Sequence, residues 1–189
     1  VVDDVYVLSR PLTADEMKVV YLVTGAAATD DGGVALPPPL LSAPLDGTPA
    51  ARVAGQGTVE AKGFGLEYAD WQRGRALVVR RHAYDRKGSC VYTDLPGPLP
   101  HRGACLVWIR PAGAKPWDGL ERGVRHPLWS LRSPSFLLEL TRTAEQQLVL
   151  RMERPTQAQV TVEVARWNSQ DAHHLGASWD FASRTLTLW

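Results

Sequence analysis

The alternation of apolar and polar residues in the C-terminal stretch, residues 161–189, constrains the fold more than any other feature of the chain. Val162 and Val164 fall on one side with Glu163 on the other, and the same pattern returns further along. There, one face carries His173, Leu175, Ala177 and Trp179, and the opposite face carries His174, Gly176 and Ser178. A period of two is typical of strands that bury one face in a core and expose the other to water.

The letters DFAS at residues 180–183 lie between two such runs and predict a hairpin turn, because Asp and Ser bond their own local backbone. Further strands are predicted at 75–79, 89–93, 105–111, 128–131, 136–140 and 148–152. Their predicted inward residues are Phe136, Leu138, Leu140, Leu148, Leu150 and Met152. Short strands at regular intervals predict an all-β fold, an antiparallel β-sandwich or jelly roll.

The N-terminal residues predict the one short helix of this fold. Residues 2–8 read as a strand, and Thr13 and Glu16 then have the spacing of a capping box, in which each side chain bonds the backbone of the other. Met17, Val20 and Tyr21 follow at the i, i+3, i+4 spacing of an apolar helical face.

Composition narrows the classes of partner. The 189 residues are 44% hydrophobic, enough for one domain with a core, and 21 basic against 20 acidic residues give a net charge of +1. No basic patch is visible, so nucleic acid is not expected as a partner. No apolar run reaches the roughly 18 residues that span a membrane, and the N-terminus lacks a signal-peptide pattern. The chain begins VVDD without Met, so we expect that a leader or a preceding domain lies outside it.

Two cysteines, Cys90 and Cys105, flank the turn-like letters LPGPLP. If their segments form neighbouring strands, the thiols would face each other, and a disulfide would suit an exported protein. A pair of buried free thiols is the alternative.

Few residues carry the signature of a reaction. His173 and His174 are adjacent, and adjacent strand residues point to opposite faces, so one metal ion cannot easily take both. Glycosidases built on sandwiches place two carboxylates close together, whereas Glu139 and Glu163 are each isolated. We therefore expect that the chain is not an enzyme.

Three stretches carry a family resemblance. They read VDDVYVLSRPLTADEM at residues 2–17, GRAL and LPGPLPHRGACLVWIRP at 74–77 and 95–111, and HHLGASWDFASRTLTLW at 173–189. These letters resemble the motifs of laminin-G-like, concanavalin A-like sandwich domains. Some members of that group bind calcium through loop carboxylates, and Asp3 and Asp4 match the acidic closing motif. The resemblance thus implies calcium as a cofactor with Asp3 and Asp4 as ligands. The alternative is that both are polar groups at a strand edge.

The order of these motifs is displaced, because the family's closing strand stands here at the start of the chain. The predicted domains are a closing strand and helix at 1–22, a Pro/Gly/Ala-rich linker at 23–57 and a laminin-G-like sandwich at 58–189 that lacks its final strands. A segment cut from a tandem array is the favoured explanation. Circular permutation and donation of residues 2–8 to another chain remain the alternatives.

Trp117 and Asp118 combine an aromatic face with a carboxylate in one loop. This combination suits stacking on a sugar and hydrogen bonding to its hydroxyls; the alternative is that Trp117 anchors its own loop.

The leading hypothesis is a non-catalytic recognition or adhesion module at the cell surface or outside the cell, which binds a polysaccharide or cell-surface glycan. The second hypothesis is a structural subunit of a surface layer, fibre or virion, whose partners are adjacent domains or copies of itself. One sandwich serves many roles, so the fold does not choose between them.

Overall fold

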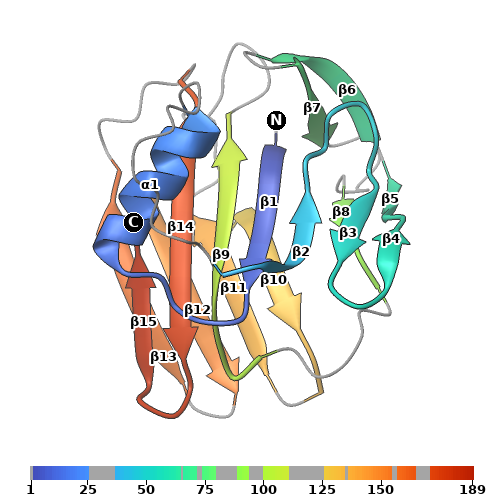
Figure 1. Ribbon diagram of the computed structural model, residues 1–189. Helices are drawn as coiled ribbons and strands as arrows, with labels where there is room; N and C mark the ends of the chain where they lie inside the picture. Colours follow the sequence, from blue (N-terminus) through green and yellow to red (C-terminus); the bar gives the residue numbers. More distant parts are fainter. Residues whose placement is uncertain are drawn as a thin grey trace.

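In the part of the chain that the computed structural model describes, two stacked layers of antiparallel β-sheet, a small two-stranded sheet and one helix make up the fold (Figure 1). The structure describes residues 2–25, 37–64, 66–71, 74–79, 89–93, 100–110, 126–134, 136–154, 157–164 and 171–189. Every pairing between described strands is antiparallel. The prediction of an antiparallel β-sandwich with one short helix is confirmed at this level.

The larger sheet has nine strands, with seven of them in the order β15-β14-β9-β1-β2-β3-β4 and the β6–β7 hairpin attached to β1 through β7. Its strands are β1 (Val2–Leu8), β2 (Pro39–Ala43), β3 (Ala51–Val53), β4 (Gly57–Val59), β6 (Leu66–Trp71), β7 (Gly74–Val79), β9 (Arg102–Ile109), β14 (His173–Asp180) and β15 (Thr185–Leu188). The turn predicted between the last two is confirmed, because Oδ1 of Asp180 accepts the N–H groups of Ala182 and Ser183 at 2.9 and 3.2 Å.

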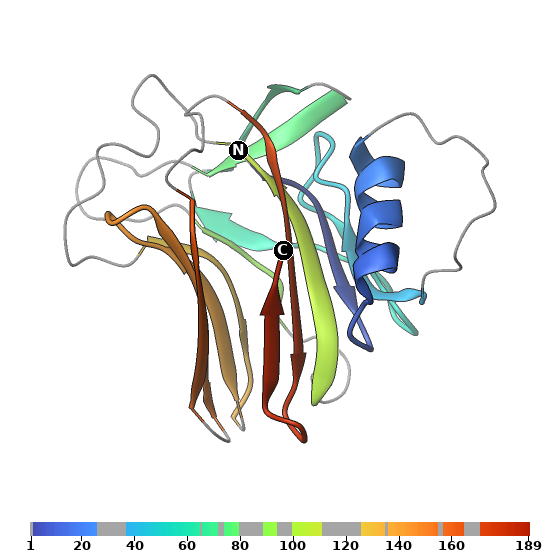
Figure 2. The same ribbon diagram turned by 90° about the vertical axis from the view of Figure 1, so that its left-hand side faces the viewer.

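The smaller layer is a four-stranded meander in the order β10-β11-β12-β13. Its strands are β10 (His126–Arg132), β11 (Leu137–Arg142), β12 (Gln147–Arg154) and β13 (Ala158–Glu163). A separate two-stranded sheet joins β5 (Lys62–Phe64) to β8 (Ser89–Val91). Figure 2 shows the four-stranded sheet stacked on one face of the larger sheet and the helix on the other.

The main core fills the space between the two sheets. The predicted inward residues of β11 and β12, together with Phe136, are each exposed by no more than 2%. They meet residues of the larger sheet, among them Val7, Leu77, Val107, Leu175 and Trp179. Burial of this apolar surface is the dominant favourable term in the stability of the sandwich.

Helix α1 (Ala14–Gly25) begins with the predicted capping box. The N–H of Thr13 donates to Glu16 at 2.8 Å, and the N–H of Glu16 donates back to Oγ1 of Thr13 at 3.2 Å. Arg10 donates to the same carboxylate at 2.5 and 3.0 Å. These partners hold the pKa of Glu16 down at about 2, with the Arg10 hydrogen bond as the largest cause.

Helix α1 covers part of the outer face of the larger sheet, over β14 and β9, which the alternating pattern did not predict. Met17 packs with Leu8, Leu12, Ala104 and Leu106 in a second, smaller core. A Cβ added at Gly176 of β14 would overlap the end of Met17, so the helix sits directly over that glycine. Both faces of the middle of β14 are therefore buried, and neither faces water.

Residues 39–59 differ from the linker expected over 23–57. They form β2, β3 and β4 at one side of the larger sheet, and Leu41, Ala43 and Leu45 are buried in the main core. Proline and glycine recur so often in this stretch that no alternating pattern extends over many residues. Strands of three to five residues form without such an extended pattern.

Strand β1 also differs from the favoured arrangement, in which it would close a preceding domain. It lies in the middle of its own chain's sheet, between β9 and β2. Both of its edges are hydrogen-bonded within the chain, so in this structure it has no free edge to add to another chain's sheet.

Candidate functional site

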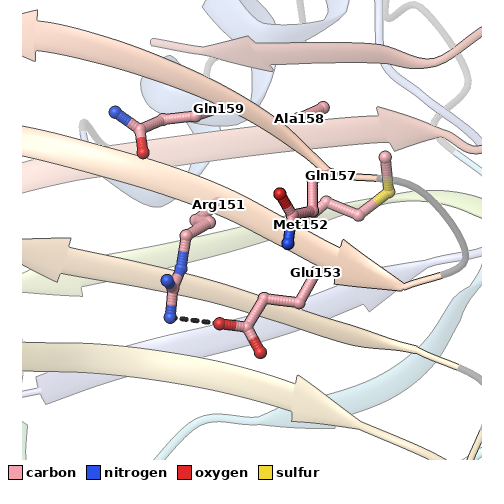
Figure 3. Close-up of a pocket in the computed structure, with 6 residues that line it drawn as sticks. All are labelled: Arg151, Met152, Glu153, Gln157, Ala158 and Gln159. Atoms are coloured by element: carbon pink, nitrogen blue, oxygen red, sulfur yellow. Dashed lines mark ion pairs between the residues drawn. The ribbon is translucent and has the colours of Figure 1, made fainter.

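A cavity of about 330 Å³ opens at one end of the β12–β13 hairpin (Figure 3). It is lined by Arg151, Met152, Glu153, Gln157, Ala158 and Gln159. The volume lies at the lower end of the range for small-molecule sites, which suits a ligand of the size of one sugar ring.

Strand alternation explains why the lining is polar. Arg151 and Glu153 share the solvent face of β12, and Gln159 lies opposite Arg151 in the register of β13. Met152 and Ala158 pair one residue further along, and the Met152 side chain points the other way, into the core. In Figure 3 its thioether lies on the opposite side of the strand from the Arg151 and Glu153 side chains. The antiparallel register thus gathers four polar side chains over an apolar core.

An ion pair organises the floor of the cavity. A guanidinium nitrogen of Arg151 bonds Oε1 of Glu153, and each side chain is 32% exposed. Nε of Arg151 is buried and has no hydrogen-bond partner among the described residues. Because this nitrogen is shielded from solvent, a ligand in the cavity meets the exposed part of the Arg151 guanidinium instead.

Gln157 and Gln159 form the outer rim, and both are exposed. The amide nitrogen of Gln159 donates to Oγ1 of Thr161 at 3.2 Å, which leaves its carbonyl oxygen open to a ligand. The lining therefore offers both donors and acceptors within one small space. This mixture suits the recognition of groups that donate and accept at once.

The predicted calcium ligands Asp3 and Asp4 lie on β1, at a bulge in its pairing with β9. Asp4 has a φ of 48°, in the left-handed region, and its Oδ1 accepts the Tyr6 hydroxyl at 3.5 Å. Asp3 is only 7% exposed and pairs with Trp108 on the outer face. Burial, then the Asp4 carboxylate, raise the pKa of Asp3 to about 7, and Asp46 adds a smaller rise.

Calcium takes six to eight oxygen ligands, so Asp3 and Asp4 alone do not complete the predicted site. Within the described ranges, no group of three or more His, Cys, Asp or Glu residues is close enough to hold a metal ion. The calcium hypothesis stays a prediction.

The two adjacent histidines point to opposite faces of β14, as their spacing predicts. His174 lies on the outer face in register with Trp108, with 5.0 Å between the ring centroids. Burial lowers the pKa of His174 to about 4, so it is neutral at physiological pH. Asp3, Trp108 and His174 thus form one row across β1, β9 and β14.

Cys90 and Cys105 are free thiols in this structure, so the predicted disulfide is not formed. The predicted condition for the bond is not met either, because β8 pairs with β5 while β9 pairs with β1 and β14. Cys105 is buried in the core, where burial raises its thiol pKa to about 12. Cys90 is partly buried, and burial raises its pKa as well.

The predicted sugar-binding residues Trp117 and Asp118 lie outside the described residues. Sequence reasoning placed Met152 correctly on the inward face of its strand but assigned no role to the polar residues beside it. The signal was the polar i, i+2 pairs Arg151/Glu153 and Gln157/Gln159 on either side of a hairpin. Polar alternation of this kind is common on solvent faces, and only the register brings the two pairs together.

No protein-family model, curated protein or solved structure matches the chain. Among the described residues, no helix is long and apolar enough to cross a membrane.

Proposed function

We propose that the chain is a non-catalytic recognition module that binds a glycan through the β12–β13 cavity. In this proposal it is a concanavalin A-like, laminin-G-like jelly roll that acts at the cell surface or outside the cell, and its partner is a polysaccharide or a cell-surface glycan. The family part of the proposal is supported by the three motif-like stretches of the sequence.

The observation that carries the proposal is the polar lining of the cavity. Arg151, Glu153, Gln157 and Gln159 present a guanidinium, a carboxylate and two amides within about 330 Å³. Sugar hydroxyls both donate and accept hydrogen bonds, and hydrogen bonds to charged partners are the stronger ones. Recognition is preferred over assembly by strand exchange because both edges of β1 are paired within the chain.

A glycan array, followed by isothermal titration calorimetry on the sugars it selects, tests the proposal. The double variant Gln157→Ala/Gln159→Ala removes both rim amides, and we expect it to bind about thirtyfold more weakly, since each of the two lost hydrogen bonds costs about 1 kcal/mol. Gln147→Ala is the matched control, because Gln147 lies on the same strand face at the far end of β12.

Unchanged binding by the double variant would refute the assignment of the site. Trp117→Ala tests the separate prediction for that loop. If it alone abolishes binding, the glycan function stands and the cavity is the wrong place for it.

A further inference from the structure

Two ion pairs match most of the charges around the β12–β13 cavity. Arg151 is bonded to Glu153 inside the cavity. Glu139 lies beside Arg151 in the register of β11 and β12, and Nη2 of Arg132 is 3.9 Å from its Oε1. Arg154, at the end of β12, donates to the Pro134 carbonyl at 3.4 Å.

This pairing has a consequence for ligand charge. A carboxylate or sulfate group that approached Arg151 would meet the negative charge of Glu153 and would have to displace it from the guanidinium. Breaking one partner out of a half-buried ion pair leaves an uncompensated charge, which is strongly unfavourable. A cationic ligand that approached Glu153 would meet the positive charge of Arg151 and would have to displace it from the carboxylate.

An uncharged hydroxyl meets neither obstacle. It can accept from the guanidinium of Arg151, whose side chain is 32% exposed, and donate to the open carbonyl oxygen of Gln159 or the second oxygen of Glu153. None of the six lining residues is aromatic, so the sugar is held by its hydroxyl groups and not by stacking of its ring face.

We propose that the cavity selects an uncharged sugar unit, bound through its hydroxyl groups, and discriminates against uronic acids and other anionic sugars. This inference rests on the proposed glycan function and specifies the ligand class of the same site. The Arg151–Glu153 ion pair is the specificity device, because Glu153 keeps the guanidinium from recruiting an anion.

The test uses sugars that differ only at carbon 6, as hydroxymethyl or carboxylate. The methyl glycosides of glucose and glucuronic acid form one pair, and those of galactose and galacturonic acid form the other. Affinities are measured by titration calorimetry for the full chain and for Glu153→Gln, which removes the competing charge while keeping the side-chain shape. Glu163→Gln is the matched control, since Glu163 is exposed on the same face at the far end of β13.

We expect the full chain to bind the neutral member of a pair at least about tenfold more tightly than the acidic one, with little dependence on salt. Glu153→Gln should narrow or invert that ratio, and Glu163→Gln should leave it unchanged. Equal or tighter binding of the uronic acid by the full chain overturns the selectivity while leaving the glycan function standing. So does a ratio that Glu153→Gln fails to move. If the array and both pairs show no binding to any sugar, the glycan function fails and this inference fails with it.

Discussion

Asp3 should make the stability of the sandwich depend on pH around neutrality, and Asp3→Asn should remove that dependence. Its carboxyl lies on the middle strand of the larger sheet and is 7% exposed. Burial and the neighbouring Asp4 and Asp46 carboxylates disfavour its charged form, which raises its pKa from 3.8 to about 7. Asparagine has nearly the same shape and never ionises, so it isolates the effect of the charge.

The size and sign of the expected change in the free energy of unfolding follow from proton linkage. A shift from 3.8 to about 7 corresponds to an upper limit of about 4 kcal/mol. Because the folded pKa is the higher one, the folded state binds more protons than the unfolded state between these values. The contribution of Asp3 is therefore complete below about pH 4 and is lost as the pH rises through about 7.

Urea denaturation across pH 4.5 to 8.5 measures this directly as the free energy of unfolding. We expect the wild type and Asp3→Asn to be similar in stability at the acidic end. At pH 8 the variant should be more stable, by about 2–4 kcal/mol. Asp15→Asn is the control, because the Asp15 side chain is 87% exposed on helix α1, and it should keep the wild-type slope. Parallel curves for the wild type and Asp3→Asn would show that Asp3 is not the source of the pH dependence, as would a variant less stable than the wild type at pH 8.

Three further predictions concern the helix, the sheet beneath it and the thiols. Thr13→Ala removes an N-cap acceptor and should lower the free energy of unfolding by about 1 kcal/mol in urea denaturation; no loss would argue against the capping box. Gly176→Ala should destabilise by about 1–3 kcal/mol through overlap with Met17, and adding Met17→Ala should recover part of that loss; additive losses would contradict the packing. In thiol titration at pH 8 without denaturant, Cys90 should react before Cys105, since Cys105 is only 2% exposed. Absence of any reactive thiol even in denaturant would show that the disulfide forms after all.

Local chemistry was the part of the fold that the sequence predicted well. The capping box at Thr13, the turn at Asp180 and the inward leucines of β11 and β12 depend on neighbours a few residues away, and all are found as predicted. These features have their own spacing rules, so a single sequence is enough to find them.

Long-range placement was harder to predict. The sequence of residues 2–8 does not predict that this strand lies between β9 and β2, because strand order depends on contacts between distant parts of the chain. Residues 39–59 resemble a linker in sequence, because proline and glycine interrupt the alternating pattern that would indicate their short strands. The polar cavity depends on the register that sets Arg151 opposite Gln159. A shift by one residue would send these side chains into the core.

A backbone amide NMR titration of the isotope-labelled chain shows directly whether the β12–β13 cavity binds a sugar. The probes are the methyl glycosides of glucose, galactose, mannose and N-acetylglucosamine. If the β12–β13 cavity is the binding site, at least one probe should produce saturable shifts that concentrate at residues 151–154 and 157–159. In Gln157→Ala/Gln159→Ala the same shifts should saturate only at much higher sugar concentration. Saturable shifts that cluster instead around Asp3, Trp108 and His174 would contradict the account, because the site would then lie on the opposite face of the sandwich.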